Sequence, residues 1–359
     1  MKKVAILNIY QGIVERGSET LIDNVSSRML KDFDLTMFSG GKNIKKPYKT
    51  VMIPFVFNLQ VDVSRSLFFQ VLHRFYLDPY SLEVFWFTLL CLPKLLRERF
   101  DIIFSVNGFW QMVLLRFLRI FKDVKIVSTG FAGVGRDSYW NLKLTSDGFV
   151  AMTNFAAKWA KEINPKIKVF TIGGGVDLKR FRPNGVRARI NLEKPIVLCV
   201  SALVPYKKVD LAIEAVSKLK KGSLLVIGDG YEKERLQSLG GRLLGSKRFR
   251  ILKVSYSKIE KFYRACDVFT LPSESSEAFG IVYLESMACG KPIVAPNDEV
   301  RREIVDEAGI LVNVKDTDDY SKALKEASEK KWLDLPRKQA AKFSWDIVVK
   351  RYKKALNQI

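Results

Sequence analysis

Short apolar runs alternate with amphipathic stretches along most of the chain, and this alternation restricts the possible folds more than any other feature. Val4–Ile9, Ile102–Val106 and Val124–Ser128 are apolar runs of strand length, and Glu19–Lys31 has the apolar spacing of a helix that Ser18 would cap. Strands that alternate with helices predict parallel sheets with helices on both faces. We therefore expect an α/β protein built of doubly wound units.

The alternation is interrupted once, over residues 164–185, where glycine and proline are frequent. It starts again with the apolar run Ile196–Ser201. A chain of 359 residues is long for a single core and usually divides into domains. We expect an N-terminal domain over residues 1–170, a C-terminal domain over 171–342 and a last helix over 343–359.

The composition is strongly basic, with 60 Lys and Arg against 38 Asp and Glu and a net charge of +22. Such a charge favours polyanionic partners (nucleic acid, anionic lipid headgroups or phosphorylated substrates), although a lysine-rich solvated surface has the same composition. The four cysteines are far apart, without a Cys-x-x-Cys pair, and His73 is the only histidine. These counts imply no disulfide framework and exclude metal sites rich in histidine.

No segment has the pattern of a membrane span or a signal peptide. The longest apolar run, Val84–Leu92, is well below the roughly 20 residues that a membrane-spanning helix needs. The apolar run Val4–Ile9 is too short for a signal peptide and has no cleavage-like segment after it. We therefore expect a cytoplasmic protein.

The segment LPSESSEAFGIVYLESMACGKPIVA, Leu271 to Ala295, has the strongest chemical signal. An apolar run leads into a loop, and Gly280 then opens a helix with Glu277 just before it and Glu285 in its second turn. Free N–H groups at a helix N-terminus suit a diphosphate, and a glycine lets the backbone approach it. Two carboxylates at this spacing, about 12 Å along a helix face, could hold hydroxyl groups at the two ends of a nucleotide sugar.

The stretch EAFGIVYLESMACGKPIVA resembles the donor-binding motif of GT-B retaining glycosyltransferases of family four, with Ala278 in place of the usual first glycine. The resemblance implies that Glu277 contacts the hydroxyls of the transferred sugar and that Glu285 contacts the ribose. The backbone amides that it assigns to the sugar and the phosphates of the donor are those of Phe279, Gly280, Ile281 and Val282.

The segment VSALVPYKKVDLAIEAV, residues 200–216, resembles the strand, loop and helix that open the C-terminal domain of the same family. The resemblance implies that Lys207 neutralises the donor diphosphate and takes part in catalysis together with Glu277. Ala202 stands where many relatives have an arginine, so Lys208 is the candidate for a second positive charge. Further donor contacts are implied at Gly17, Gly228 and Val254.

The N-terminal half resembles the family less closely. Many relatives place a histidine near the reacting sugar, but Phe131 stands at that point of VSTGFAGVGRD, and His73 is too early in the chain to replace it. The polar candidates for holding the acceptor are Asn107, Arg136 and Asp137. Residues 51–121 are rich in aromatic residues, leucine and arginine, a pattern typical either of core helices or of a basic amphipathic surface that docks on anionic lipid.

The resemblance covers nearly the whole chain and implies a GT-B architecture, with two Rossmann-like domains facing across a cleft and the helix over 343–359 crossing back to the first. It implies a metal-independent retaining glycosyltransferase without a cofactor, which moves a sugar from a nucleotide-sugar donor (GDP-mannose or a UDP-sugar) to a glycan or lipid-linked acceptor in cell-surface polysaccharide or glycolipid synthesis. The inner face of the membrane is then an expected partner surface.

Two alternatives remain. The first is a non-catalytic GT-B subunit that binds the nucleotide sugar without turnover, which Ala202 and Phe131 favour. The second is a nucleic-acid-binding protein. Only the net charge motivates it, because the chain lacks an interleaved basic and aromatic motif.

Overall fold

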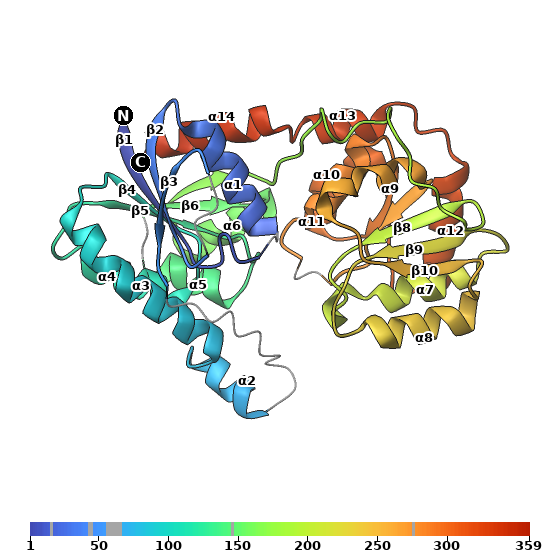
Figure 1. The fold of residues 1–359 in the computed structure, drawn as a ribbon, viewed down its shortest axis with the longest axis horizontal. Coiled ribbons are helices and arrows are strands. Elements are labelled where there is room, and N and C mark those ends of the chain that lie inside the picture. The colour runs from blue at the N-terminus through green and yellow to red at the C-terminus, as the bar shows by residue number, and fades with distance from the viewer. Residues whose placement is uncertain (15–16, 42–45, 55–66, 145–146, 275–276) are drawn as a thin grey trace. The chain divides into compact units, whose positions relative to one another are not determined.

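The computed structural model describes residues 1–359 except 15–16, 42–45, 55–66, 145–146 and 275–276. The chain forms two compact units (Figure 1), of which the first consists of residues 1–173 and 348–359 and the second of residues 174–347. Each unit contains one parallel sheet with helices packed against it. The predicted α/β class is confirmed.

The first unit has a parallel sheet in the order β3-β2-β1-β4-β5-β6-β7. Its strands are β1 (Lys2–Asn8), β2 (Phe33–Ser39), β3 (Lys49–Met52), β4 (Ile102–Ser105), β5 (Lys125–Thr129), β6 (Gly148–Ala151) and β7 (Lys168–Thr171). Its helices are α1 (Gly17–Met29), α2 (Leu67–Arg74), α3 (Pro79–Arg97), α4 (Phe109–Leu118), α5 (Arg136–Lys143) and α6 (Asn154–Ile163). The chain order reverses at β1, since β2 and β4 flank it on opposite sides.

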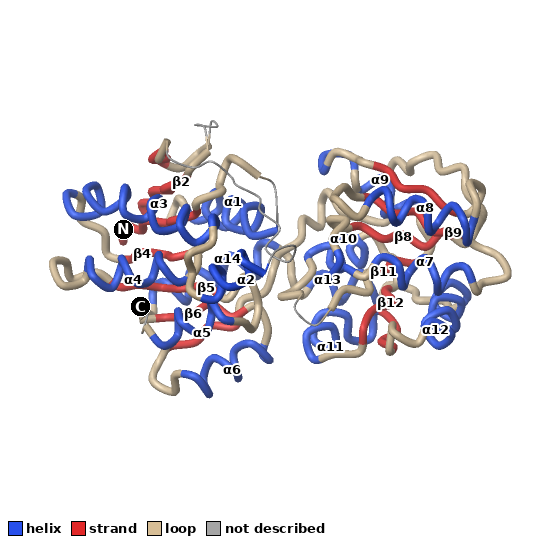
Figure 2. Tube along the Cα trace, turned by 90° about the horizontal axis from the view of Figure 1, so that it is seen from below, coloured by secondary structure: helices blue, strands red, loops and turns tan. Residues whose placement is uncertain are grey.

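Helices cover both faces of this sheet (Figure 2) because alternate side chains of each strand point to opposite faces. On β4, Ile103 packs into a cluster with Phe87 of α3 and Met112 of α4. Its neighbour Phe104 instead contacts Tyr352 on the other face, with ring centroids 6.1 Å apart. Tyr352 lies on α14 (Trp345–Asn357), whose residues from 348 onward belong to the first unit.

The second unit has a parallel sheet in the order β10-β9-β8-β11-β12-β13. Its strands are β8 (Ile196–Val200), β9 (Ser223–Ile227), β10 (Phe249–Leu252), β11 (Val268–Thr270), β12 (Ile293–Pro296) and β13 (Gly309–Val312). Its helices are α7 (Val209–Ser217), α8 (Lys233–Leu244), α9 (Glu260–Ala265), α10 (Ile281–Ala288), α11 (Glu299–Val305), α12 (Thr317–Glu329) and α13 (Leu335–Ala341). The order reverses between β8 and β11, and ligands of such sheets bind outside the carboxyl ends of the strands at this point.

Two local predictions were wrong. Ser18 lies inside α1 and does not cap it, and its hydroxyl donates to Glu19 Oε2 at 3.0 Å. Lys168–Thr171, which the sequence assigns to the segment between the domains, is the edge strand β7 paired with β6. A run of four residues is too short to show a period of its own, so only its partner strand identifies it.

The glycine-rich segment after β7 packs closely against the start of α14. Val176 N donates to Phe343 O at 3.0 Å, and Val176 and Ser344 form a parallel bridge. A Cβ on Gly175 would lie 2.3 Å from the Trp345 ring, so only glycine permits this approach. Among the residues that the structure describes, no helix is both long and apolar enough to cross a bilayer.

The core of the second unit yields a test of stability. Leu225 on β9 is fully buried, whereas Leu243 on α8 is 40 % exposed. Leu225→Ala should lower the free energy of unfolding by about 3 kcal/mol because it leaves a cavity, and Leu243→Ala by less than about 0.5 kcal/mol. Urea unfolding followed by circular dichroism measures both, and equal losses would contradict the assigned burial.

Candidate functional site

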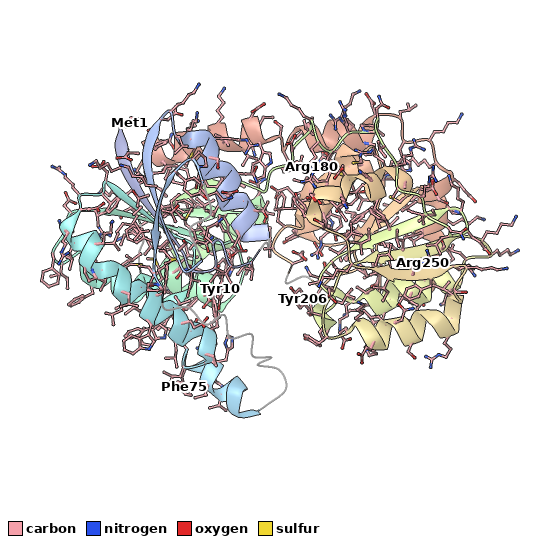
Figure 3. All side chains as sticks on the ribbon, in the orientation of Figure 1. Met1, Tyr10, Phe75, Arg180, Tyr206 and Arg250 are labelled. Carbon is pink, nitrogen blue, oxygen red and sulfur yellow. The ribbon has the colours of Figure 1, made fainter. Side chains whose placement is uncertain are left out.

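The loops that follow the neighbouring strands β8 and β11 meet at the carboxyl edge of the second sheet. Lys207 ends the turn Pro205–Lys207 after β8, and Glu277 lies in the loop after β11. Their side chains form an ion pair and are only 13 % and 15 % exposed. The backbone joins the loops as well, since Glu274 N donates to Tyr206 O at 2.9 Å (Tyr206 is labelled in Figure 3). The structure thus brings together the two residues to which the sequence assigns catalysis.

Lys208 adds a second positive charge to the same edge. Its Nζ lies 3.0 Å from Glu274 Oε1, in an ion pair that is partly exposed. Its backbone has a φ of 49°, the left-handed conformation, in which it leads directly into α7. Each of the two lysines therefore has a carboxylate neighbour from the loop after β11.

Helix α10 begins beside this ion pair with its N-terminus open. Gly280 is its N-cap residue at a φ of 83°, and a Cβ there would lie 2.7 Å from the Tyr283 ring. Within the described residues no side chain caps α10, so the amides of Ile281 and Val282 in its first turn remain available to an anion. Phe279 anchors the preceding loop because it is buried against the Phe343 ring, 5.8 Å away.

Glu285 lies deeper than the sequence indicates. We expected it at the edge of a buried surface, but it is 3 % exposed. Its Oε1 accepts from the Tyr256 hydroxyl at 2.7 Å and its Oε2 from the Tyr263 hydroxyl at 2.8 Å. The spacing estimate along one helix face does not hold either, since Glu277 precedes the first residue of α10, Ile281.

Burial makes the protonation of Glu285 sensitive to pH near neutrality. Loss of hydration raises its pKa from the usual 4.5 to about 7, and the hydrogen bonds from Tyr256 and Tyr263 limit the rise. The Arg180 guanidinium, 4.3 Å above the Tyr256 ring, also favours the ionised form. The sequence did not indicate that the two tyrosines contact Glu285, because a tyrosine near or on an amphipathic helix is also typical of a core.

Gly228 and Val254 lie at the same carboxyl edge, after β9 and β10. Gly228 has a clear structural role, because a Cβ there would lie 1.9 Å from Ser201 O in the loop after β8. Val254 is half-buried. Gly17 begins α1 in the first unit. The donor contacts implied for these three residues remain predictions.

In the first unit, Arg136 and Asp137 at the start of α5 lie beside the only histidine. Arg136 Nη1 donates to His73 O at 2.8 Å, its Nη2 donates to Arg74 O, and its guanidinium lies 4.2 Å above the Tyr76 ring. Burial raises the pKa of Asp137, against the lowering effects of the Tyr76 hydroxyl and the charge of His73. Although His73 is far from α5 in the chain, the fold brings the two together.

The remaining residues of this region have structural contacts. Asn107 Oδ1 accepts from Ile9 N and Asn107 N donates to Gln111 Oε1, each at 3.0 Å, so this side chain holds the end of β1 in place. Phe131 is half-buried in the turn after β5. His73 Nδ1 lies 3.1 Å from Asp78 Oδ2, and Asp78 caps α3. We call Arg136, Asp137, His73 and Tyr76 the α5 cluster.

Neither the cavity nor the acidic, cysteine and histidine side chains of the described residues indicate a further functional site. A cavity of about 290 Å³ in the first unit lies near Phe100 and Val124, before β4 and β5, and thus opposite the carboxyl edge of the sheet. In the described ranges, no group of three or more His, Cys, Asp or Glu is arranged to hold a metal ion.

Comparisons with known proteins point to one class. Residues 185–343 match the family model "Glycosyl transferases group 1". The chain is 30 % identical over 207 residues to a GDP-mannose-dependent monoacylated alpha-(1-6)-phosphatidylinositol monomannoside mannosyltransferase of Corynebacterium glutamicum, a match to 49 % of this chain and 53 % of that protein. It is 26 % identical to an uncharacterized glycosyltransferase of Methanocaldococcus jannaschii, over 96 % of this chain and 95 % of the other.

Solved structures share the whole fold. Sucrose-phosphate synthase from Thermosynechococcus elongatus superposes with a TM-score of 0.76 at 17 % identity, covering 100 % of this chain and 99 % of the other. Anabaena HepE in complex with UDP and glucose gives a TM-score of 0.73 at 16 % identity, covering 100 % of both chains.

The protein therefore has the GT-B fold of glycosyltransferases. Its residues 185–343, which contain the Lys207–Glu277 pair, Glu285 and α10, belong to the glycosyl transferases group 1 family. The predicted GT-B fold is confirmed, and the predicted family is confirmed for residues 185–343. The chain spans about half the length of the mannosyltransferases that it matches.

The raised pKa of Glu285 predicts a pH-dependent stability. Between pH 4.5 and 7 the folded state holds a proton that the unfolded state has lost, so this stabilising contribution disappears as the pH rises through 7. Relative to Glu285→Gln, the wild type should lose about 3 kcal/mol of unfolding free energy from pH 4.5 to 8. Urea titrations of both proteins at several pH values measure the difference, and parallel pH profiles would be inconsistent with a raised pKa.

Proposed function

We propose that the protein is a retaining glycosyltransferase that transfers a sugar from a nucleotide-sugar donor to a glycan or lipid-linked acceptor without a metal ion. The observation that carries the proposal is the Lys207–Glu277 pair beside the open N-terminus of α10. Both features lie where the order of a parallel sheet reverses, and within the residues that match the family model.

Lys207 and α10 supply what a leaving diphosphate requires. The Nζ of Lys207 carries a positive charge and is largely shielded from water, so its attraction to phosphate oxygens is stronger than in bulk solvent. The amides of Ile281 and Val282 add donors and the positive end of the helix dipole. In this proposal Lys207 moves from Glu277 to the diphosphate, and Glu277 then accepts hydrogen bonds from hydroxyl groups of the sugar.

In this proposal, the main contribution of the protein to the reaction is the positive charge of Lys207 and of the α10 N-terminus. The acceptor oxygen forms a bond to the anomeric carbon on the face from which the diphosphate leaves, and a phosphate oxygen of the donor takes the acceptor proton. Lys207 and the α10 amides stabilise the negative charge that grows on the diphosphate as the glycosidic bond breaks. Because these groups already supply positive charge, we propose that no metal ion is needed.

Glu285 is proposed to bind the ribose hydroxyls. A carboxylate has about four acceptor positions, so the bonds from Tyr256 and Tyr263 leave room for further donors. Tyr256 is 41 % exposed and can move aside, whereas Tyr263 is fully buried. Within the second unit, Gly228, Val254, the amides of Phe279 and Gly280, and the charge of Lys208 complete the proposed donor contacts.

The donor and the acceptor are proposed from the relatives. A related mannosyltransferase is named for GDP-mannose and a phosphatidylinositol mannoside, and a structural neighbour was solved with UDP and glucose. We propose GDP-mannose or a UDP-sugar as the donor, and a lipid-linked or cell-surface glycan as the acceptor, used at the inner face of the membrane. Arg136, Asp137 and Asn107 are the proposed acceptor residues.

A second candidate is a non-catalytic subunit that binds a nucleotide sugar. Ala202 stands where the family resemblance implies an arginine, and both nearby lysines already pair with carboxylates. Binding without turnover would favour this candidate.

Nucleotide binding tests the proposal first. One class of nucleoside diphosphate, GDP or UDP, should raise the melting temperature of the wild type, and Glu285→Ala should lower its affinity at least about tenfold, because the ribose loses a charged acceptor. Isothermal calorimetry with GDP, UDP and ADP measures both. If none of them binds, the proposed donor site is wrong.

A measurement of turnover distinguishes the proposed enzyme from the non-catalytic binding subunit. Lys207→Met should lower the transfer rate about 100-fold or more, because the leaving diphosphate loses its buried positive charge. Lys322→Met removes an equal charge from a side chain that is 78 % exposed on α12, and it should leave the rate unchanged. Sugar release from radiolabelled donor measures both variants. A wild type that binds the nucleotide but never turns over would make the protein a binding subunit.

A further inference from the structure

The outward side of α3 is apolar although it faces solvent. The inward side packs into the core through Val84, Phe87, Cys91 and Leu95. The exposed side chains on the same helix are Leu82 at 39 %, Trp86 at 46 %, Leu90 at 45 % and Leu96 at 39 %. No charged residue lies between Glu83 and Lys94. A surface helix normally turns polar residues outward, so this pattern requires an explanation.

The apolar area continues onto the neighbouring elements. Phe85 of α3 contacts the rings of Trp86 and of Trp110 on α4, with centroids 5.3 Å apart in both pairs. At and beyond the end of α4, Phe117, Ile120 and Phe121 are 55 %, 72 % and 62 % exposed. At the end of α2, Val71 and Phe75 are 49 % and 64 % exposed (Phe75 is labelled in Figure 3). We call the exposed apolar residues of α2, α3 and α4 the α3–α4 face.

Basic residues follow or flank the apolar residues of this face along the chain, although Lys94 pairs with Glu98, and Arg119 and Lys125 both pair with Asp147. The exposed or half-buried basic residues of the stretch are Arg74, Lys94, Arg97, Arg99, Arg116, Arg119, Lys122 and Lys125. Its exposed acidic residues are Glu98, Asp101 and Asp123, whereas Asp78 and Glu83 are buried. The whole chain has a net charge of +22. An apolar centre with a cationic border is complementary to a surface that is apolar inside and anionic outside.

We propose that the α3–α4 face docks on the surface of a bilayer that contains anionic lipid, with α3 lying in the interface. The 19 residues of α3 would extend about 28 Å along that plane. Trp86 has the ring chemistry that prefers the headgroup level, and leucine and phenylalanine side chains reach the acyl boundary. A second copy of the chain fits less well, since a two-fold contact through this face would set its cationic borders against each other.

This docking deepens the proposed function because it places two proposed acceptor residues of the α5 cluster, Arg136 and Asp137, next to the lipid. Arg136 of the α5 cluster donates to the carbonyl oxygens of His73 and Arg74 in α2. The next residue, Phe75, belongs to the α3–α4 face, and Asp78 then caps α3. A headgroup at the α2–α3 junction would therefore lie near Arg136 and Asp137. The inference rests on the proposed function only in this last step, since docking itself depends on the α3–α4 face.

The test is flotation of the purified full chain with vesicles, using matched double variants. Leu82→Glu with Leu90→Glu adds two charges to the face. Leu243→Glu with Leu333→Glu makes the same change at exposed leucines of the second unit, which are 40 % and 86 % exposed. With vesicles of phosphatidylcholine and phosphatidylglycerol, the wild type and the Leu243/Leu333 variant should bind alike. The Leu82/Leu90 variant should bind at least about tenfold more weakly, because two apolar anchors are lost.

Phosphatidylcholine vesicles alone should bind the wild type weakly, and brominated lipid should quench its tryptophan fluorescence less in Trp86→Phe. Equal binding of the two double variants would overturn the proposal, as would equal binding to both vesicle types. A third result would also overturn it: the wild type binds no vesicles and elutes as a dimer in size-exclusion chromatography, and the Leu82/Leu90 variant elutes as a monomer. GDP and UDP titrations of the same variants report the donor site separately, so a failure of the proposed function would be recognised independently of docking.

Discussion

The pairing of β8 with β11 organises the second unit. Residues distant in the chain become neighbours because Leu198 of β8 lies opposite Phe269 of β11 in a parallel ladder. Parallel strands end at the same edge of a sheet, so the loops after them must meet there. Lys207 and Glu277 come from these two loops. Their ion pair follows from the pairing of the strands, and so does the position of α10, which the second loop leads into.

The candidate site contains one largely buried lysine and two carboxylates that are buried to different extents. Lys207 and Glu277 are nearly removed from water, which is unfavourable for each charge alone and tolerable for the pair. Glu285 accepts hydrogen bonds from two tyrosine hydroxyls, and the cost of its burial appears as a raised pKa. A diphosphate and a ribose offer these carboxylates and Lys207 new partners. Under the proposed function, the ligand of this arrangement carries both groups.

In the first unit, apolar residues of α3 occupy two different environments, the core and the exposed surface. Phe87 and Leu90 are similar apolar residues three positions apart on α3, yet Phe87 is in the core and Leu90 is 45 % exposed. The helix is apolar on both sides, and the sheet can cover only one of them. The junction of α2 and α3 links this exposed side to Arg136 and Asp137, which connects the two features that the sequence treats separately.

The sequence by itself determined the alternation of strands and helices, the α/β class and the motif around Glu277, Gly280 and Glu285, because these depend on periodicity and on spacing along the chain. The tertiary structure decided what depends on contacts between distant segments. It put β7 at the edge of the first sheet, buried Glu285 under Tyr256 and Tyr263, and brought His73 to Arg136. No local pattern contains such information, since burial and partners are set by the elements that pack against a residue and not by the residues beside it in the chain.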